Sequence, residues 1–506
     1  MPLKESWNVS SVPSLRIRTV NNEEVSGSSD YVLYWMIANR RAGYNFSLQR
    51  AVEWAKKLSK PLVILEALRS DYPWASDRMH QFIIEGMAGN ALQFAKRNVL
   101  YYPYIEAKHG AGKGLMKHLA NRACVVVSDD FPCFFLPRMI EAASRHISVR
   151  FEAVDSNGLL PMRAAEKVFA RAFDFRRFLQ KHLLPHLAEI PKRDPLSRVK
   201  LPILKSLPTN ITKSWPKSDP AELLTAGNYL KSLPIDHAVQ TVMTTGGLRS
   251  ANRVLRLFLK SRLPIYESDR NQPDQEATSG LSPYLHFGHI SAHQVFEEVT
   301  AHEQWTPDKV AAKSSGSSSG WWGVNAAAES FLDELITWRE LGYNMCWQRQ
   351  DYDQYESLPD WAQRTLAEHA SDPRQHAYTL EQFETAQTHD QLWNAAQRQL
   401  VCEGKIHNYL RMLWGKKILE WSTSPRDALH IMIELNNKYA LDGRNPNSYS
   451  GIFWVLGRYD RAWGPERPIF GKIRYMSSEN TARKVRVKRY IQNYAELDIQ
   501  KQVSFE

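Results

Sequence analysis

The chain has 506 residues, 43% of them hydrophobic and 24% charged, which excludes a disordered protein and allows two or three domains with substantial cores. Its formal net charge of +11 at pH 7 favours an anionic partner, nucleic acid ahead of an anionic membrane surface, although a merely solvated basic surface explains the charge as well. The 16 Trp, 21 Tyr and 19 Phe suit flat ligands and bases as well as cores.

The cysteines and the N-terminus exclude further classes of protein. Cys124, Cys133, Cys346 and Cys402 lack C-x-x-C spacing, so we expect reduced thiols of an intracellular protein and neither a disulfide framework nor a zinc site. The N-terminus has no apolar signal-peptide core, and no run of about 18 apolar residues occurs. We therefore expect a soluble, metal-free monomer without a membrane partner, in the cytoplasm of a bacterium or in the nucleus or an organelle of a eukaryote.

The N-terminal half predicts an α/β domain. Its first 28 residues are polar and Ser-rich, and we expect a flexible arm there. Residues 29–185 then alternate helical patterns with short apolar runs, which are typical of strands buried on both faces: YVLYWM (31–36), PLVILEA (61–67), ACVVVSDD (123–130) and ISVRFEAVD (147–155). This alternation predicts a Rossmann-like domain with a parallel, doubly wound sheet. HGAGKG (109–114) fits neither common phosphate-binding pattern, so we interpret it as an ordinary loop.

The C-terminal half predicts a different architecture. Residues 186–236 are rich in Pro, Lys, Ser and Leu, and we expect an interdomain linker there. From 237 to 492, helical patterns dominate, which predicts an all-helical second domain. KSSGSSSGWWG (313–323) is a low-complexity insert in this domain, which we interpret as a flexible surface loop.

Two local patterns in the helical half have two explanations each. Thr278, Ser279 and Ser282 precede a helical pattern, and they suit either a phosphate at a helix N-terminus or a simple cap and turn. Trp414 and Trp421 lie seven positions apart in one helical pattern, so both project from nearly the same face. That periodicity alone favours core packing.

Six longer motifs follow one another in this half: SGLSPYLHFGHIS, DELITWREL, THDQLWNAAQ, YLRMLWGKKILEW, ELNNKYALDGRNPNSYSGIFW and YDRAWG with GKIRYMS. In this order they resemble the class II cyclobutane pyrimidine dimer photolyases, within the photolyase and cryptochrome family. The resemblance covers most of residues 240–490, with a weaker likeness in the N-terminal half. It implies a flavin enzyme that holds U-shaped FAD in its helical domain. Light excites the reduced flavin, which passes an electron to a flipped-out pyrimidine dimer in DNA, and the cyclobutane ring then splits.

The resemblance implies a set of FAD contacts. The diphosphate site would be formed by Tyr266, Thr278, Ser279, Leu281 and Ser282. Asn436, whose amide can donate and accept hydrogen bonds, matches the family residue at flavin N5, and Arg339 matches a further contact. Arg411 and Asp442 match an ion pair beside the flavin, although they also fit a purely architectural buried pair.

The resemblance also implies a set of contacts to UV-damaged DNA. Glu334 is similar to the acid that contacts the dimer and shares a proton with it, and Trp338 with Trp454 resembles the walls of the dimer pocket. Four further residues resemble those that engage the lesion strand or fill the gap left by the dimer: Arg270, Arg461, Trp463 and Arg474.

By the same resemblance, Trp393, Trp414 and Trp421 look like the tryptophan chain that passes electrons from the surface to the flavin during its photoreduction. Burial of these tryptophans in the core is compatible with this second role. An antenna chromophore, a deazaflavin or a folate, binds the α/β domain of many relatives, but no residue set here indicates whether one binds.

Three features depart from the family pattern. The segment 455–462 is one residue shorter than usual, Gly342 and Tyr343 replace small and acidic residues, and the insert 313–323 has no counterpart.

Three functions fit the sequence. The first is light-driven repair of pyrimidine dimers by a deoxyribodipyrimidine photo-lyase, a carbon–carbon lyase, which Glu334, Trp338 and Trp454 favour. The second is a cryptochrome-like blue-light photoreceptor, which the short tail after KRYIQNY disfavours. The third is a flavin-free nucleic-acid-binding protein, against which Asn436 and the pair of Arg411 and Asp442 argue.

Overall fold

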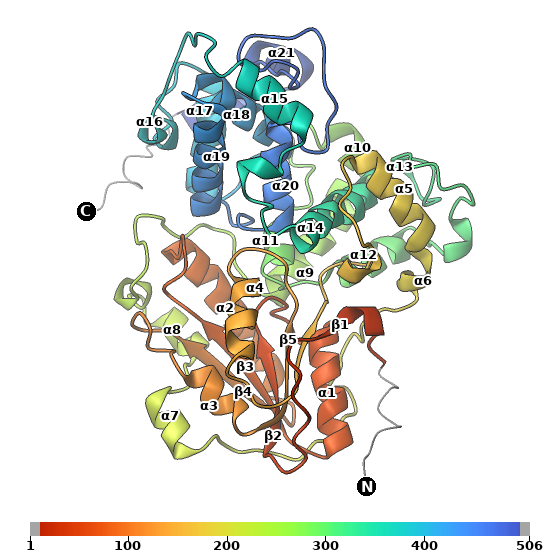
Figure 1. The fold of residues 1–506 in the computed structure, drawn as a ribbon, viewed down its shortest axis with the longest axis vertical. Helices are drawn as coiled ribbons and strands as arrows, with labels where there is room; N and C mark the ends of the chain where they lie inside the picture. The colour runs from red at the N-terminus through yellow and green to blue at the C-terminus, as the bar shows by residue number, and fades with distance from the viewer. Residues whose placement is uncertain (1–10, 496–506) are drawn as a thin grey trace.

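The computed structural model describes residues 11–495 and contains an α/β part and a helical part, below and above in Figure 1. The six-stranded sheet has the order β1-β6-β5-β2-β3-β4, and all neighbours are parallel except β1 and β6. Its strands are β1 (Ile17–Thr19), β2 (Tyr31–Met36), β3 (Leu62–Leu68), β4 (Leu100–Ile105), β5 (Ala123–Asp129) and β6 (Phe151–Val154). The predicted α/β fold with a mostly parallel sheet is thereby confirmed.

Burial on both faces explains the apolar strands. Along β2, Leu33 and Trp35 enter one hydrophobic cluster, whereas Tyr34 and Met36 enter the cluster on the opposite face. Helix α1 covers the second face, and α3 and α4 pack on the first. The helices of this part are α1 (Phe46–Leu58), α2 (Asp77–Phe94), α3 (Leu115–Ala120) and α4 (Leu136–Ser144). Because both faces of the sheet are covered, polar and apolar residues do not alternate along its central strands.

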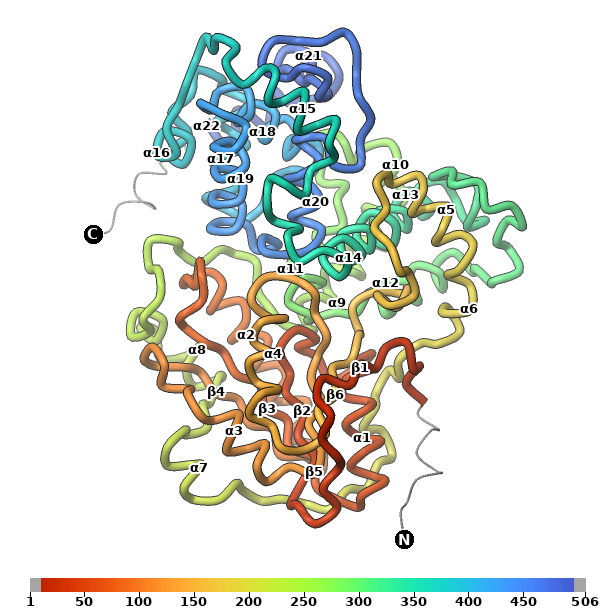
Figure 2. Tube along the Cα trace, in the orientation of Figure 1, coloured from red at the N-terminus to blue at the C-terminus, as the bar shows by residue number. Residues whose placement is uncertain are grey.

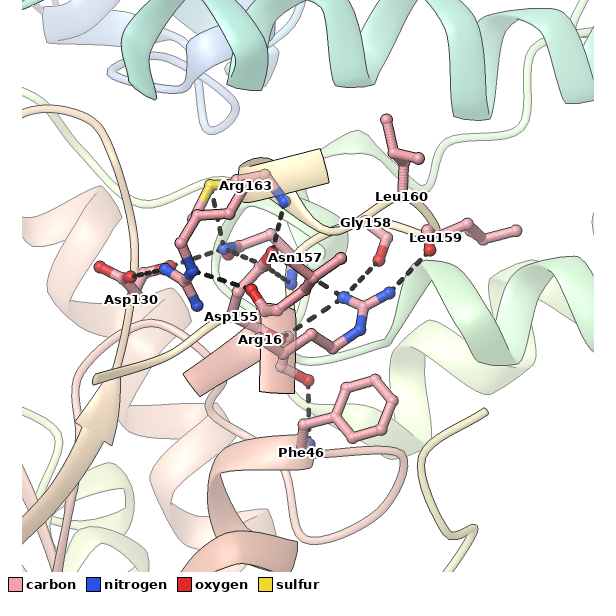
Figure 3. A network of polar contacts seen from close by, with 12 residues as sticks. Arg16, Phe46, Asp130, Asp155, Asn157, Gly158, Leu159, Leu160 and Arg163 are labelled. Atoms are coloured by element: carbon pink, nitrogen blue, oxygen red, sulfur yellow. Dashed lines mark hydrogen bonds and ion pairs between the residues drawn. The ribbon is translucent and has the colours of Figure 1, made fainter. Parts of the chain in front are cut away.

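The N-terminal segment differs from the expected flexible arm. Residues 1–10 lie outside the described part of the chain, but Ile17–Thr19 forms the antiparallel edge strand β1. The preceding Arg16 is fully buried and donates hydrogen bonds to the carbonyl oxygens of Gly158, at 3.1 Å, and Leu159, at 2.7 Å (Figure 3). A buried guanidinium with these partners fixes the segment to the domain.

The linker region wraps around the α/β part. In Figure 2 the yellow-green chain runs beside the sheet domain before it rises to the helical part. Its helix α7 (Thr209–Ser214) contacts α3, and α8 (Pro220–Thr225) contacts α2. Helix α5 (Ala172–His182), which lies within the residues expected to form the α/β domain, instead contacts the π-helical turn η7 (Asp333–Trp338) of the helical half. Helix α6 (Leu184–Leu187) follows it.

The helical half is built as the sequence predicts. Its helices are α9 (Leu248–Leu257), α10 (Tyr266–Asp269), α11 (Ser282–His286), α12 (Ala292–His302), α13 (Ala326–Leu332), α14 (Arg339–Gln348), α15 (Asp360–Glu368), α16 (Leu380–Glu384), α17 (Gln391–Glu403), α18 (Asn408–Trp421), α19 (Pro425–Tyr439), α20 (Pro446–Val455), α21 (Ser478–Lys484) and α22 (Lys488–Ala495). Between residues 11 and 495, no helix is both long and apolar enough to cross a membrane.

The Ser/Gly-rich insert is held in place, in contrast to the flexible loop that we expected. Glu329 of α13 accepts hydrogen bonds from the backbone N–H groups of Gly320, Trp321 and Trp322, at 2.6, 2.7 and 2.9 Å. Both indoles of the insert are buried. The Ser/Gly composition indicated a flexible loop, but the hydrogen bonds to Glu329 and the burial of both indoles hold the insert in place.

Candidate functional site

Three of the predicted flavin contacts come together from separate elements. Arg411 of α18 donates to Asp442, which follows α19, at 3.1 Å, and Ser282 at the start of α11 donates to the same carboxylate at 2.5 Å. Burial alone would raise the pKa of Asp442, but the Arg411 charge and these hydrogen bonds outweigh burial and hold the pKa below its ordinary value. Asp442 is therefore an anion over the physiological pH range.

This cluster is partly open to solvent. Of the side-chain surface, 22% is accessible in Arg411 and 18% in Asp442. Within residues 11–495, Nε of Arg411 and Nη1 of Arg339 are buried without a hydrogen-bond partner. Buried guanidinium donors are costly when unpaired, so both fit a ligand that brings carbonyl or phosphate oxygens.

Asn436 of α19 is buried and its amide is oriented by the protein. Its Nδ2 donates to the hydroxyl of Ser448 at 2.6 Å and to Oδ1 of Asn437 at 3.2 Å. In this orientation the carbonyl oxygen is the end that can accept from a ligand N–H. Ser448, on α20, is a contact that the sequence analysis did not single out.

Tyr266 lies with the predicted lesion residues. The Arg270 guanidinium is 5.6 Å from the centre of the Tyr266 ring and forms an ion pair with Glu334. Thr278, Ser279 and Leu281 lie in the loop that leads into α11, where Leu281 N donates to the Ser279 hydroxyl at 3.3 Å. The diphosphate role of these residues stays a prediction.

Glu334 is partly exposed, with 31% of its side-chain surface accessible. Burial raises the pKa of Glu334, with a further contribution from the Asp333 charge, and this outweighs the opposing effects of Arg270 and Arg176. A carboxyl group with a raised pKa holds a proton more readily than an ordinary one, which suits hydrogen bonding to a carbonyl oxygen.

Trp338 and Trp454 stack on each other. Their ring centres are 4.7 Å apart and their planes differ by 17°. We expected them to form the walls of a pocket, but at this separation no base fits between them. In this arrangement a dimer can only contact the outer surface of the pair.

Trp463 is flanked by two arginines on the loop after α20. The guanidinium of Arg461 is 4.6 Å from its ring centre and that of Arg474 is 5.3 Å away. Both arginines are exposed, and Trp463 Nε1 donates to Asp460 at 3.0 Å. The three predicted DNA contacts thus form one basic and aromatic cluster, a combination that suits phosphates and unpaired bases.

The three predicted chain tryptophans also come together, all of them buried. The rings of Trp393 and Trp421 are 6.1 Å apart at 69°, and Nε1 of Trp393 donates to the backbone carbonyl of Trp414 at 3.0 Å. Trp421 further contacts the exposed His389, at 4.9 Å between ring centres. The row of rings therefore extends from the interior to the surface.

A cavity of about 670 Å³ lies in the α/β part. Side chains from the ends of the strands line it, such as Trp35 and Tyr104, and Phe134 and Phe135 contribute further rings. The loop 109–114, which we interpreted as ordinary, also borders it, and His286 and Arg444 reach it from the helical half. No motif in the sequence pointed to this cavity.

Comparisons with known proteins agree with this architecture, although no family model matches the chain. It is 33% identical to a deoxyribodipyrimidine photo-lyase of Methanothermobacter thermautotrophicus over 94% of this chain and 97% of that protein. A deoxyribodipyrimidine photo-lyase of Potorous tridactylus is 32% identical over 93% of this chain and 82% of its own length.

Solved structures share the fold at low sequence identity. A class III photolyase from Agrobacterium tumefaciens has a TM-score of 0.65 at 17% identity, over 94% of this chain and 89% of that chain. A cryptochrome from Synechocystis has a TM-score of 0.60 at 14% identity, over 94% of this chain and 91% of that chain. From the relatives of more than 30% identity along nearly its whole length, the chain belongs to the photolyase and cryptochrome family.

Proposed function

We propose that the protein is a deoxyribodipyrimidine photo-lyase of class II, which repairs cyclobutane pyrimidine dimers in UV-damaged DNA with light. One observation carries the proposal. Glu334 and Trp338, the predicted dimer contacts, lie on the turn η7, and Arg339, the predicted flavin contact, is the first residue of α14, which continues it. A dimer and a flavin bound to these residues would be neighbours, as direct electron transfer requires. The curated relatives named above support the same activity.

The predicted flavin contacts fit FAD. The unpaired donors of Arg339 and Arg411 suit the oxygen atoms of the flavin ring and the diphosphate, and the carbonyl of Asn436 suits the N–H that a reduced flavin carries at N5. Asp442, held as an anion, keeps Arg411 in place. Reduced FAD bound there would supply the electron for dimer cleavage after it absorbs blue or near-UV light.

The remaining groups would act on the DNA. The stacked Trp338 and Trp454 offer an apolar surface for a dimer that has left the duplex, and Glu334 in its protonated form can donate a hydrogen bond to a pyrimidine carbonyl. Trp463 with Arg461 and Arg474 suits the unpaired bases and phosphates around the gap.

The decisive experiment illuminates dimer-containing DNA with the purified protein after its flavin has been reduced. We expect blue light to restore intact thymines and a sample kept in the dark to leave the dimers unchanged. If a protein with fully reduced FAD leaves dimers intact under light, the repair proposal fails and the photoreceptor alternative gains support.

We further propose that the 670 Å³ cavity binds a second, light-harvesting chromophore. Its aromatic lining suits a flat ring system, and charged groups such as Arg40 and Lys113 could hold an ionic tail. The solved archaeal photolyase from Sulfolobus tokodaii contains two FAD molecules, with the implication of a novel light-harvesting cofactor. Acid extraction of the protein from its native host, followed by absorption spectroscopy, would distinguish a deazaflavin, a folate or a second flavin, and recovery of FAD alone at one equivalent would contradict a second chromophore.

A further inference from the structure

Helix α5 is joined to the turn η7 by a bidentate ion pair. Arg176 donates from Nε to Oδ1 of Asp333 at 2.7 Å and from Nη2 to Oδ2 at 2.8 Å. Both side chains are largely buried, and two parallel hydrogen bonds to a carboxylate fix its position and direction. Asp333 is the first residue of η7 and directly precedes Glu334.

The same arginine reaches two further groups. Its guanidinium carbon is 5.9 Å from the centre of the Trp338 ring, at the other end of η7. Its Nη1 donates to the carbonyl of Gly316, in the Ser/Gly-rich insert, at 3.4 Å. One side chain therefore connects α5, the insert and both ends of the turn that carries the predicted dimer contacts.

The insert is itself attached to α5. Gln180 accepts from Gly316 N at 2.7 Å, and its amide donates to Ser317 O at 2.9 Å. Gly316 has a φ of +79°, which L side chains rarely adopt, and a Cβ there would lie 3.0 Å from the Phe173 ring, so glycine suits this contact best. The insert thus packs on α5 and contacts the same arginine that binds η7.

Arg176 thus holds a π-helical turn from outside its own helix. Such turns are rare in proteins and occur frequently at functional sites. We propose that Arg176, supported by the insert 313–323, is a positioning residue for dimer recognition, which acts through Asp333 to hold Glu334 and Trp338 in their binding arrangement. This inference rests on the proposed function, because that function gives Glu334 and Trp338 their role.

The charges around Glu334 allow a test that distinguishes positioning by Arg176 from general damage to the fold. Glu334 faces Arg270 and Tyr266 from α10, Asp333 from its own turn and Arg176 from α5. Arg176 lowers the pKa of Glu334, whereas Asp333 raises it. Arg176→Gln and Asp333→Asn break the same ion pair, yet they should move the pKa of Glu334 in opposite directions.

The experiment measures binding of dimer-containing DNA in the dark as a function of pH. We expect both variants to bind the dimer roughly 5- to 10-fold more weakly than the wild type, because each loses a largely buried, bidentate pair. The pH midpoint of dimer binding should rise in Arg176→Gln and fall in Asp333→Asn. In the double variant the two shifts should largely cancel, and no unpaired charge remains to destabilise the fold. Arg177→Gln removes the same charge from the exposed neighbour of Arg176 and should leave both quantities unchanged.

A second measurement needs neither DNA nor light. Hydrogen exchange of the backbone amides in residues 313–338 should be faster in Arg176→Gln and in Gly316→Ala than in Arg177→Gln. Unchanged exchange in the first two, or pH midpoints that move in the same direction in Arg176→Gln and Asp333→Asn, would overturn the inference. Failure of the wild type to bind or repair dimers would instead overturn the proposed function, while the exchange measurement would still test the support of η7.

Discussion

At the scale of single residues, the predicted flavin contacts are oriented by neighbours outside the set that the sequence indicated. Arg339 donates from Nη2 to the hydroxyl of Tyr343 at 3.1 Å and lies 4.5 Å over its ring. This contact leaves Nη1 of Arg339 as the donor for a ligand, a physical role for Tyr343, which we expected to depart from the family pattern. Ser448 plays the corresponding part for Asn436.

We expect Ser448→Ala to release the amide of Asn436 from its fixed orientation. The lost hydrogen bond is worth about 1 kcal/mol, which shifts the orientation of the amide by roughly fivefold. The carbonyl would then be less available to the N–H of a reduced flavin, so reduced flavin in the variant should reoxidise faster in air in the dark. Ser450→Ala, on the same helix, is the control, and equal reoxidation rates in the two variants would contradict this role of Ser448.

At the scale of elements, burial determined which strands the sequence could predict. Strand β2 is covered on both faces and appears as a continuous apolar run, so its bounds were predicted correctly. The edge strand β4 was missed because Pro103 interrupts its apolar pattern, and an edge position tolerates a proline. Strand β1 has only three residues, two of them polar, and its pairing with β6 leaves no periodic signal.

In the candidate site, too, the sequence predicted some features and missed others. Arg461 and Trp463 belong to one motif, whereas Arg411 and Asp442 belong to two, and it was the resemblance to the family that paired them. The stack of Trp338 on Trp454 and the ion pair of Arg176 with Asp333 join segments more than 100 residues apart, and no local pattern encodes such a contact. Sequence reasoning therefore identified the residues of the candidate site better than their arrangement.

The packing of α17 against α18 makes the tryptophan row testable. Trp414→Phe should keep the buried face apolar, but it loses the hydrogen bond from Nε1 to Gln397, at 2.9 Å, and some packed volume, which together cost at least about 1 kcal/mol of stability. Photoreduction of bound flavin should slow strongly, because phenylalanine is much harder to oxidise than tryptophan. Flash photolysis would measure the rate, with Trp54→Phe in α1 as the control. If photoreduction is as fast as in the control, Trp414 serves core packing alone.

At the scale of the whole molecule, the loop of residues 156–160 fastens the α/β part to the helical part. From one side Arg16 holds the carbonyl oxygens of Gly158 and Leu159 (Figure 3). From the other side Glu340, on α14, accepts from Leu159 N at 2.6 Å and from Leu160 N at 3.0 Å. Because α14 begins with Arg339, this contact ties the predicted flavin site to the α/β part.

Glu340 should make the stability of this junction depend on pH. Burial raises its pKa from 4.5 to about 7, against the opposing effects of Arg339, the two backbone N–H groups and Arg16. Below pH 4.5 both the folded and the unfolded chain hold the proton, and the neutral carboxyl contributes its full stability. Between 4.5 and 7 only the folded chain holds it, so the free energy of unfolding falls as pH rises and then stays constant above 7.

Glu340→Gln is neutral at every pH and should remove this dependence. Relative to the variant, we expect the wild type to lose on the order of 2 kcal/mol of unfolding free energy between pH 5 and pH 8. Thermal unfolding of both proteins across this range would measure the difference between their midpoints, with Glu329→Gln as the control, since Glu329 also accepts backbone hydrogen bonds but lies within the helical half. If the difference between the wild type and Glu340→Gln stays constant with pH, Glu340 is already ionised in the folded protein, and the junction carries a buried charge that Arg16 and Arg339 must balance.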